Sequence, residues 1–171
     1  MNVDNFKPAF VYMIYISSTP ERVWDALTSA EFSRKYFSGL AVETELTTGG
    51  AFVVRMPDGS IHISGEVIEC DPPRKLTITW NVNRPDLVEK LGVTLVTYEI
   101  EPAGEGTIRL TLMQAHERQL SDDILSGGRA GWPAILSSLK SLLETGAALV
   151  VKMEPLQRML AALKKMGIEI P

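Results

Sequence analysis

The sequence contains few residues of the kinds that form cross-links or hold metal ions. It has one cysteine, Cys70, and two histidines among 171 residues. A single cysteine cannot form an internal disulfide, and no C-x-x-C or H-x-x-x-H spacing offers a set of metal ligands. We therefore expect a reducing, intracellular environment, and we predict neither a metal ion nor another cofactor.

Long hydrophobic runs and an excess of basic charge are also absent. No stretch approaches the roughly 18 apolar residues of a membrane-spanning helix, and Asp4 and Pro8 interrupt the segment where a signal peptide needs an apolar core. Seventeen basic and 21 acidic residues give a formal net charge of −4, which does not attract nucleic acid or an anionic bilayer. These features predict a soluble, cytoplasmic protein with no nucleic-acid or membrane partner.

The N-terminal part of the chain predicts one strand followed by two short helices. Residues 10–16 are rich in β-branched and aromatic side chains, which favours a strand. Thr19 is placed to cap a helix that has Pro20 at its first position, so we predict a helix over residues 20–28. A second short helix is predicted over residues 31–37.

The middle of the chain predicts an antiparallel sheet. Between Leu40 and His116 the hydrophobic period is two, interrupted by turn residues, and segment 84–92 is interpreted as a longer link. Strands are expected near residues 40–46, 51–56, 61–70, 75–83, 93–101 and 107–116. The face predicted to turn inward carries Phe52, Val54, Met56, Ile61, Ile63, Val67, Leu76, Ile78, Trp80, Tyr98, Ile100, Ile108, Leu110 and Leu112. The opposite parity, which includes Thr77 and Thr79, is predicted to face solvent.

Helical spacing returns after Gly127 and Gly128, a pair that we interpret as a hinge. Apolar residues then predict a helix from Arg129 to Val151, or to a nearer end at Thr145, with a length of about 30 Å at 1.5 Å per residue. A last short helix is predicted from Pro155, and its apolar stripe packs either on its own domain or across a dimer axis. That stripe consists of Leu156, Met159, Leu160 and Leu163. We assign residues 1–150 to one domain and residues 151–171 to a helical extension of it.

The order of these elements predicts an α+β fold, in which a curved antiparallel sheet of about seven strands wraps on the long C-terminal helix. Three segments carry a family resemblance: P-E-R-V-W-D-A-L-T at 20–28, G-E-V-I-E-C-D-P-P-R-K-L-T-I-T-W at 65–80 and G-W-P-A-I-L-S-S-L-K-S-L-L-E-T-G at 131–146. In this order they resemble the START-like, birch-pollen-allergen-like (SRPBCC) helix-grip superfamily, specifically the activator of Hsp90 ATPase homologue-like family. The resemblance covers about residues 8–146 and implies the helix-grip fold. Members of this superfamily include lipid carriers, cyclases, dioxygenase subunits and co-chaperones, so the resemblance implies a function in one of these classes.

The leading functional hypothesis is a module that binds a small apolar or amphipathic molecule between the sheet and the long helix. No G-x-S-x-G, P-loop or G-x-G-x-x-G motif is present to indicate a nucleophile or a phosphate site. Tyr98 and His116 are expected to supply the polar anchors. The predicted ligand contacts are Phe52, Val54, Trp80, Tyr98, Leu110, Leu112, His116, Trp132, Leu136 and Leu139.

Two further functions stay open at this stage. His116 ends the last strand in the inward parity, so it acts either as a general base in a cyclase- or hydrolase-type enzyme or as a hydrogen-bonded histidine at a strand end. His62 has the opposite parity and is expected to be exposed. The family resemblance implies a co-chaperone that stimulates an Hsp90-type ATPase. The predicted partners are therefore a small apolar ligand, a chaperone and a second copy of the chain.

Overall fold

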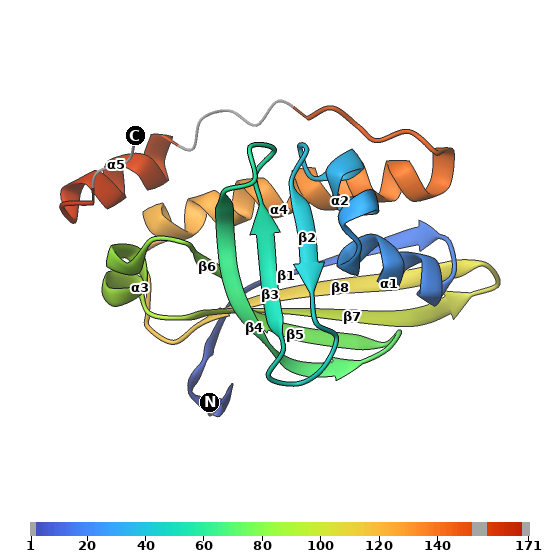
Figure 1. The fold of residues 1–171 in the computed structure, drawn as a ribbon, viewed down its shortest axis with the longest axis horizontal. Helices are drawn as coiled ribbons and strands as arrows, with labels where there is room; N and C mark the ends of the chain where they lie inside the picture. The colour runs from blue at the N-terminus through green and yellow to red at the C-terminus, as the bar shows by residue number, and fades with distance from the viewer. Residues whose placement is uncertain (1–2, 152–156, 169–171) are drawn as a thin grey trace.

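The computed structural model describes residues 3–151 and 157–168, and in it a curved sheet is wrapped on one long helix (Figure 1). The strands are all paired antiparallel in the order β1-β8-β7-β5-β4-β3-β2, and β6 pairs with β4. The predicted α+β helix-grip architecture is confirmed. The elements are η1 (Val3–Asn5), β1 (Lys7–Ser17), α1 (Pro20–Thr28), α2 (Ala30–Tyr36), β2 (Ala41–Thr44), β3 (Ala51–Arg55), β4 (Ile61–Asp71), β5 (Lys75–Thr79), β6 (Asn81–Val82), α3 (Pro85–Leu91), β7 (Thr94–Gly104), β8 (Thr107–His116), α4 (Asp122–Thr145) and α5 (Gln157–Lys165).

Local sequence explains the two short helices at one end of the sheet. Thr19 caps α1, because its Oγ1 accepts a hydrogen bond from the backbone N–H of Arg22 at 3.3 Å, and Pro20 is the first helical residue. In α2, the Ser33 hydroxyl accepts a hydrogen bond from the Val42 N–H at 2.8 Å. This bond ties α2 to β2, and both predicted helices are present.

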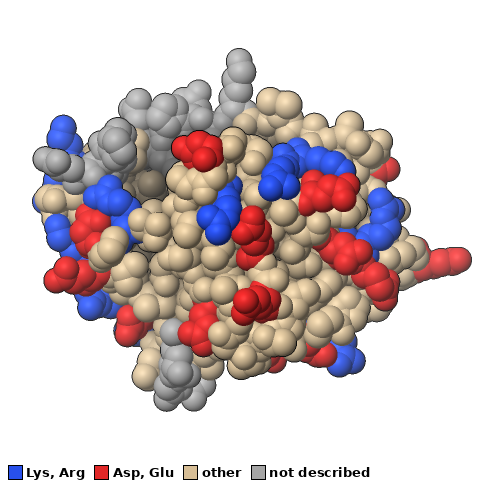
Figure 2. All heavy atoms as spheres, viewed as in Figure 1, with Lys and Arg blue, Asp and Glu red and all other residues tan. Residues whose placement is uncertain are grey.

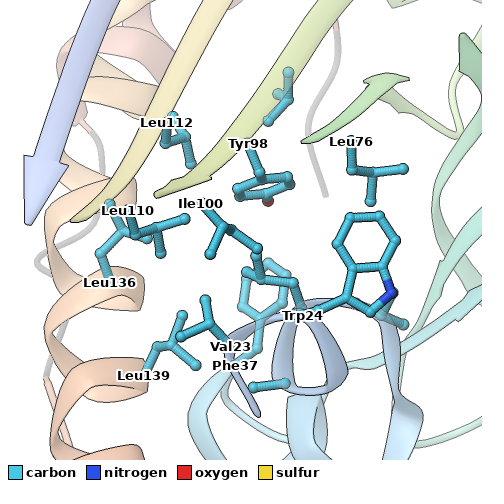
Figure 3. Packing of buried hydrophobic residues seen from close by; sticks show 14 of the residues in the cluster. Val23, Trp24, Phe37, Leu76, Tyr98, Ile100, Leu110, Leu112, Leu136 and Leu139 are labelled. Atoms are coloured by element: carbon cyan, nitrogen blue, oxygen red, sulfur yellow. The ribbon is translucent and has the colours of Figure 1, made fainter. Parts of the chain in front are cut away.

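The core lies between the inward face of the sheet and α4 (Figure 3). Leu136 and Leu139 of α4 are buried in one cluster with Leu110 and Leu112 of β8, and Tyr98 of β7 belongs to the same cluster. The long helix therefore packs on the concave side of the sheet, as the hydrophobic pattern predicts. Burying such side chains stabilises the fold by about 1.5–3 kcal/mol each.

The burial predicted from strand parity is wrong at four positions. Met56 and Ile61 flank the turn between β3 and β4, and they are 39% and 38% exposed. Thr77 and Thr79 are buried instead of facing solvent. Their hydroxyls have partners, because Thr77 bonds Thr97 Oγ1 at 3.1 Å and Thr79 accepts from the Glu66 N–H at 2.8 Å. A satisfied hydroxyl can be buried at little cost.

The predicted strand over residues 75–83 is split at Trp80. β5 pairs with the last part of β4, with Val67 opposite Ile78, whereas β6 pairs with its first part, with Ile63 opposite Val82. Between these two pairings β4 has Gly65, and a Cβ atom added there would collide with the backbone carbonyl oxygen of Thr79. Glycine at position 65 thus permits the close approach of the two strands at the break.

Helix α4 begins seven residues before its predicted start at Arg129. Ser121 caps it by accepting a hydrogen bond from the Ile124 N–H. Two aspartates in the first turn stabilise the helix, because their negative charges lie near the positive end of the helix dipole. The interpretation of Gly127 and Gly128 as a hinge is wrong, because both lie inside the helix. Their missing side chains leave room for neighbours: a Cβ at Gly127 would collide with the Met159 sulfur, and one at Gly128 would lie 2.7 Å from the Phe10 ring. The helix ends at Thr145, the nearer of the two predicted ends.

Pro133 lies inside α4 and has no N–H to donate to the carbonyl of Arg129. The Tyr12 hydroxyl of β1 donates to that carbonyl instead, at 2.8 Å. We expect Tyr12→Phe to lower the free energy of unfolding by about 0.5–1.5 kcal/mol, because this bond is lost. Urea denaturation measures the change. Tyr15→Phe on the same strand is the matched control and should have a smaller effect; equal effects would contradict the role given to Tyr12.

The outer edge of β1 is covered along one part by side chains of α4. Lys140 Nζ donates to the Tyr15 carbonyl at 2.6 Å, and Glu144 Oε1 accepts from the Ser17 N–H at 2.8 Å. Lys140 also hydrogen-bonds Glu144, and this bond together with the one from Ser17 lowers the pKa of the Glu144 carboxyl. On the outer face of the same strand, Val11, Met13 and Tyr15 are exposed.

Two helices meet beside the N-terminal half of α4. Segment 84–92, predicted to be a longer link, contains α3, with Pro85 in its first turn. In α5, Leu163 is buried in a small cluster with Ile124 of α4 and Ile168. The predicted start at Pro155 and the stripe residue Leu156 lie outside the described residues. Leu163 packs on its own chain, and a dimer through the rest of that stripe stays a prediction.

Charged side chains of both signs are interspersed on the face of the molecule shown in Figure 2. Within residues 3–151 and 157–168, no helix is long and apolar enough to cross a membrane. The same residues contain no cluster of three His, Cys, Asp or Glu side chains that could hold a metal ion.

Candidate ligand pocket

A pocket of about 350 Å³ lies beside the N-terminal half of α4. This volume falls at the lower end of the range for small-molecule sites, roughly 300–1,000 Å³. Its described lining contains no Lys, Arg, Asp or Glu. The lining is mainly apolar and consists of Phe37, Leu40, Ile63, Trp80, Val82, Leu87, Val88, Leu91, Gly92, Leu120, Ile124, Leu125, Gly127, Gly128, Gly131, Trp132, Ile135 and Met159, with Ser38, His62, Asn81, Thr94, Gln114 and His116 as its polar members.

Aromatic rings separate this pocket from the centre of the fold. The ring centroids of Trp80 and Trp132 are 5.0 Å apart, and Trp80 also lies 6.2 Å from Phe37 and 5.9 Å from Phe52. Tyr98 meets the Trp132 ring edge-on at 6.4 Å. Around these rings, between the sheet and the middle of α4, a void of only about 10 Å³ remains. The space for a ligand therefore lies at one end of the sheet rather than at its centre.

One wall of the pocket is a chain of hydrogen-bonded side chains. Trp132 Nε1 donates to Gln114 Oε1 at 2.6 Å, and Gln114 Nε2 lies 2.9 Å from His116 Nε2. His116 Nδ1 lies 3.0 Å from Thr94 Oγ1. Gln114 and His116 are neighbours on one face of β8, and His116 is opposite Thr94 of β7. Strand register thus brings this polar wall together.

The direction of each hydrogen bond in this wall follows from Trp132. An indole N–H is only a donor, so the Gln114 oxygen faces Trp132 and the Gln114 amide N–H₂ faces His116. His116 Nε2 must then accept, which leaves the ring proton on Nδ1 to donate to Thr94. Burial favours the same neutral form, because it lowers the pKa of His116 from 6.5 to about 4.

His116 consequently has no free lone pair in this arrangement. One ring nitrogen accepts from Gln114 and the other carries the proton, so the geometry matches the prediction of a hydrogen-bonded histidine at a strand end better than that of a general base. His62 lies at the rim of the pocket and is exposed as predicted. Partial burial of its ring lowers its pKa.

The ten predicted ligand contacts fall into three groups. Trp80, His116 and Trp132 line the pocket. Phe52, Tyr98, Leu136 and Leu139 surround the small central void, to which Trp80 and Trp132 also contribute. The third group, Val54, Leu110 and Leu112, is fully buried in the core. Tyr98, expected to be a polar anchor, lies at the void, where burial raises the pKa of its hydroxyl.

Several lining residues are missing from the sequence-based prediction. They come from α3, which the predictions assigned to a link, and from the loop before α4 and the first two turns of α4, where the predictions contain no element apart from the hinge at Gly127 and Gly128. The pattern Pro85, Leu87, Val88 and Leu91 could have indicated α3, because proline is common at a helix start and the three apolar residues share one helical face.

Comparison with solved structures shows the same fold in proteins of several organisms. The Aha1 dimer from Colwellia psychrerythraea has a TM-score of 0.64 at 18% identity, covering 80% of this chain and 96% of that chain. An HSP90 activator from Plasmodium falciparum has a TM-score of 0.58 at 25% identity, covering 72% and 86%. CalU16 from Micromonospora echinospora has a TM-score of 0.62 at 21% identity, covering 80% and 76%.

Curated protein sequences give no significant match to this chain. The family model described as activator of Hsp90 ATPase homolog 1-like protein, in contrast, matches residues 17–144. The match runs from the end of β1 almost to the end of α4 and so includes strands β2 to β8 and most of the pocket. The chain therefore belongs to the activator of Hsp90 ATPase homolog 1-like family.

Proposed function

We propose that this protein binds a small, uncharged, mainly apolar molecule in the pocket between α3, α4 and β6. The observation that carries the proposal is the pocket itself: about 350 Å³ of space with an apolar lining and a single hydrogen-bonded wall. Such a combination is typical of small-molecule sites, where apolar surface supplies affinity and a few polar groups fix orientation. The absence of charged groups among its described lining residues favours an uncharged ligand, because an ion would lose its hydration without gaining a counter-charge.

The apolar walls would supply most of the binding energy. Burial of apolar ligand surface contributes roughly 25 cal/mol per Å² before the cost of association is subtracted. Trp80 and Trp132 contribute aromatic surface to the pocket, and aliphatic residues of α3 also line it. The predicted contacts Trp80, His116 and Trp132 are part of this proposal. Phe52, Tyr98, Leu136 and Leu139 would act indirectly, by holding the aromatic rings in place.

Filling the pocket tests this proposal. Val88 of α3 lines the pocket, so Val88→Trp should weaken binding of the neutral fluorescent probe N-phenyl-1-naphthylamine at least about tenfold, because the larger ring occupies the probe's space. Glu89→Trp is the matched control, because Glu89 is the next residue of α3 and is exposed. Fluorescence titration gives both dissociation constants. Equal binding by the two variants, or no binding by the unmodified protein, would refute the proposal.

Stimulation of an Hsp90-type ATPase is a second candidate function. It is supported by the family description and by the fold shared with the HSP90 activator from Plasmodium falciparum. A steady-state ATPase assay with the Hsp90 homologue of the host tests it. Higher turnover at saturating protein supports this function, and unchanged turnover refutes it.

A further inference from the structure

The polar wall of the pocket has an unequal supply of donors and acceptors. Gln114 Oε1 already accepts from Trp132, and His116 Nε2 already accepts from Gln114. Thr94 Oγ1 accepts from His116, and Asn81 Oδ1 accepts from the Thr94 backbone N–H at 3.2 Å. Each of these four acceptor atoms in the polar wall therefore already has a hydrogen-bond donor.

Some hydrogen-bond donors of the polar wall, in contrast, have no acceptor among the described residues. Because Thr94 Oγ1 accepts from His116, its own O–H remains free to donate. Gln114 uses one of its two amide N–H groups on His116. Asn81 uses its oxygen on Thr94, and among the described residues its two N–H groups have no partner. All three residues line the pocket.

We infer that the ligand presents a hydrogen-bond acceptor, such as a ketone, ester or ether oxygen, to the free donors of Thr94, Gln114 and Asn81. This inference rests on the proposed function and names the chemical class of its ligand. An unpaired N–H or O–H in a desolvated site costs about 1–3 kcal/mol, so a ligand without an acceptor would leave these donors unsatisfied. A second lone pair on an oxygen, in contrast, often stays unused at little cost.

Two uncharged probes of nearly the same shape test the inference. 2-Acetylnaphthalene carries a carbonyl oxygen, and 2-isopropenylnaphthalene has a CH₂ group in its place. Their dissociation constants are measured by displacement of N-phenyl-1-naphthylamine. The quantity compared is the preference ratio, which is the dissociation constant of the hydrocarbon divided by that of the ketone. Comparing this ratio between protein variants cancels the difference in hydration of the two probes.

Variants of the donors should change this ratio. In Thr94→Val the hydroxyl is lost, and in Asn81→Asp the N–H₂ group becomes an oxygen while the acceptor for the Thr94 N–H is kept. We expect the ratio to fall by about three- to tenfold in each variant, which corresponds to one lost hydrogen bond. Thr94→Ser retains a hydroxyl and is the matched control, in which the ratio should stay within about twofold of the unmodified protein.

The possible outcomes separate this inference from the proposed function. If both probes bind and the ratio is the same in the unmodified protein, Thr94→Val and Asn81→Asp, the inference is overturned and the proposed function stands. If N-phenyl-1-naphthylamine and both probes fail to bind the unmodified protein, the proposed function fails and the inference fails with it. If N-phenyl-1-naphthylamine binds and the ketone does not displace it, the inference is overturned and the proposed function stands. If Thr94→Val does not fold, the preference ratio of Asn81→Asp alone decides whether the inference holds.

Discussion

Replacing Gly65 with alanine is expected to lower the free energy of unfolding by about 3 kcal/mol or more, the upper end of what overpacking costs. The added Cβ would overlap the backbone carbonyl oxygen of Thr79, and a backbone atom cannot turn aside as a flexible side chain can. The collision falls where the pairing partner of β4 changes from β5 to β6. Relief therefore requires β4 and β5 to separate, with loss of neighbouring hydrogen bonds.

Urea denaturation at neutral pH measures this effect. Ser64→Ala, at the preceding residue of β4, is the matched control and should change stability by less than about 1 kcal/mol. Because Trp80 immediately follows Thr79, the Gly65 variant should also weaken binding of the naphthylamine probe. A Gly65→Ala protein as stable as the Ser64 control would show that the strands do not approach as closely as described.

Acidification is expected to destabilise the protein through His116. The pKa of His116 is about 4 in the folded protein, whereas an unfolded histidine has a pKa near 6.5. Between these values the unfolded chain binds a proton that the folded chain does not. The contribution of His116 to the free energy of unfolding is therefore fully present above about pH 7. It falls as the pH decreases, by up to about 1.4 kcal/mol per pH unit and about 3 kcal/mol in total.

The contribution of His116 is isolated by comparing the native protein with His116→Gln in urea between pH 7 and 4.5. The variant should lose stability less steeply, because position 116 no longer titrates; identical slopes would contradict this account.

NMR titration of the two histidine rings adds a direct test. In Trp132→Phe, Gln114 is free to turn its oxygen toward His116, so the pKa of His116 should rise toward 6.5.

Much of the fold could be predicted because local signals and periodicity agree with it. Thr19 and Pro20 mark the start of α1 through their own backbone chemistry, and that prediction holds to the residue. The inward parity of β8 identifies His116 as facing the helix. The predictions fail where a contact with a residue far away in the sequence determines the local structure. Gly127 and Gly128 are weak helix formers, and only the neighbours Met159 and Phe10 explain why they lie inside α4.

The position of the pocket was harder to predict than the fold. The sequence indicates which side chains point inward, but it does not show whether their volumes fill the space between sheet and helix. Phe52, Trp80 and Trp132 fill the centre, and the open space is displaced toward α3. Helix α3 has no buried residue and only two turns, so its apolar pattern is too short to stand out.

The side chains of Lys140 and Glu144 also affect how this protein behaves at high concentration. A strand at the border of a sheet is a template on which a foreign strand can add, and such addition starts edge-to-edge aggregation. By occupying the Tyr15 carbonyl and the Ser17 N–H, the α4 side chains remove two of the backbone groups that an incoming strand would need. The two side chains that join α4 to β1 should therefore also work against polymerisation.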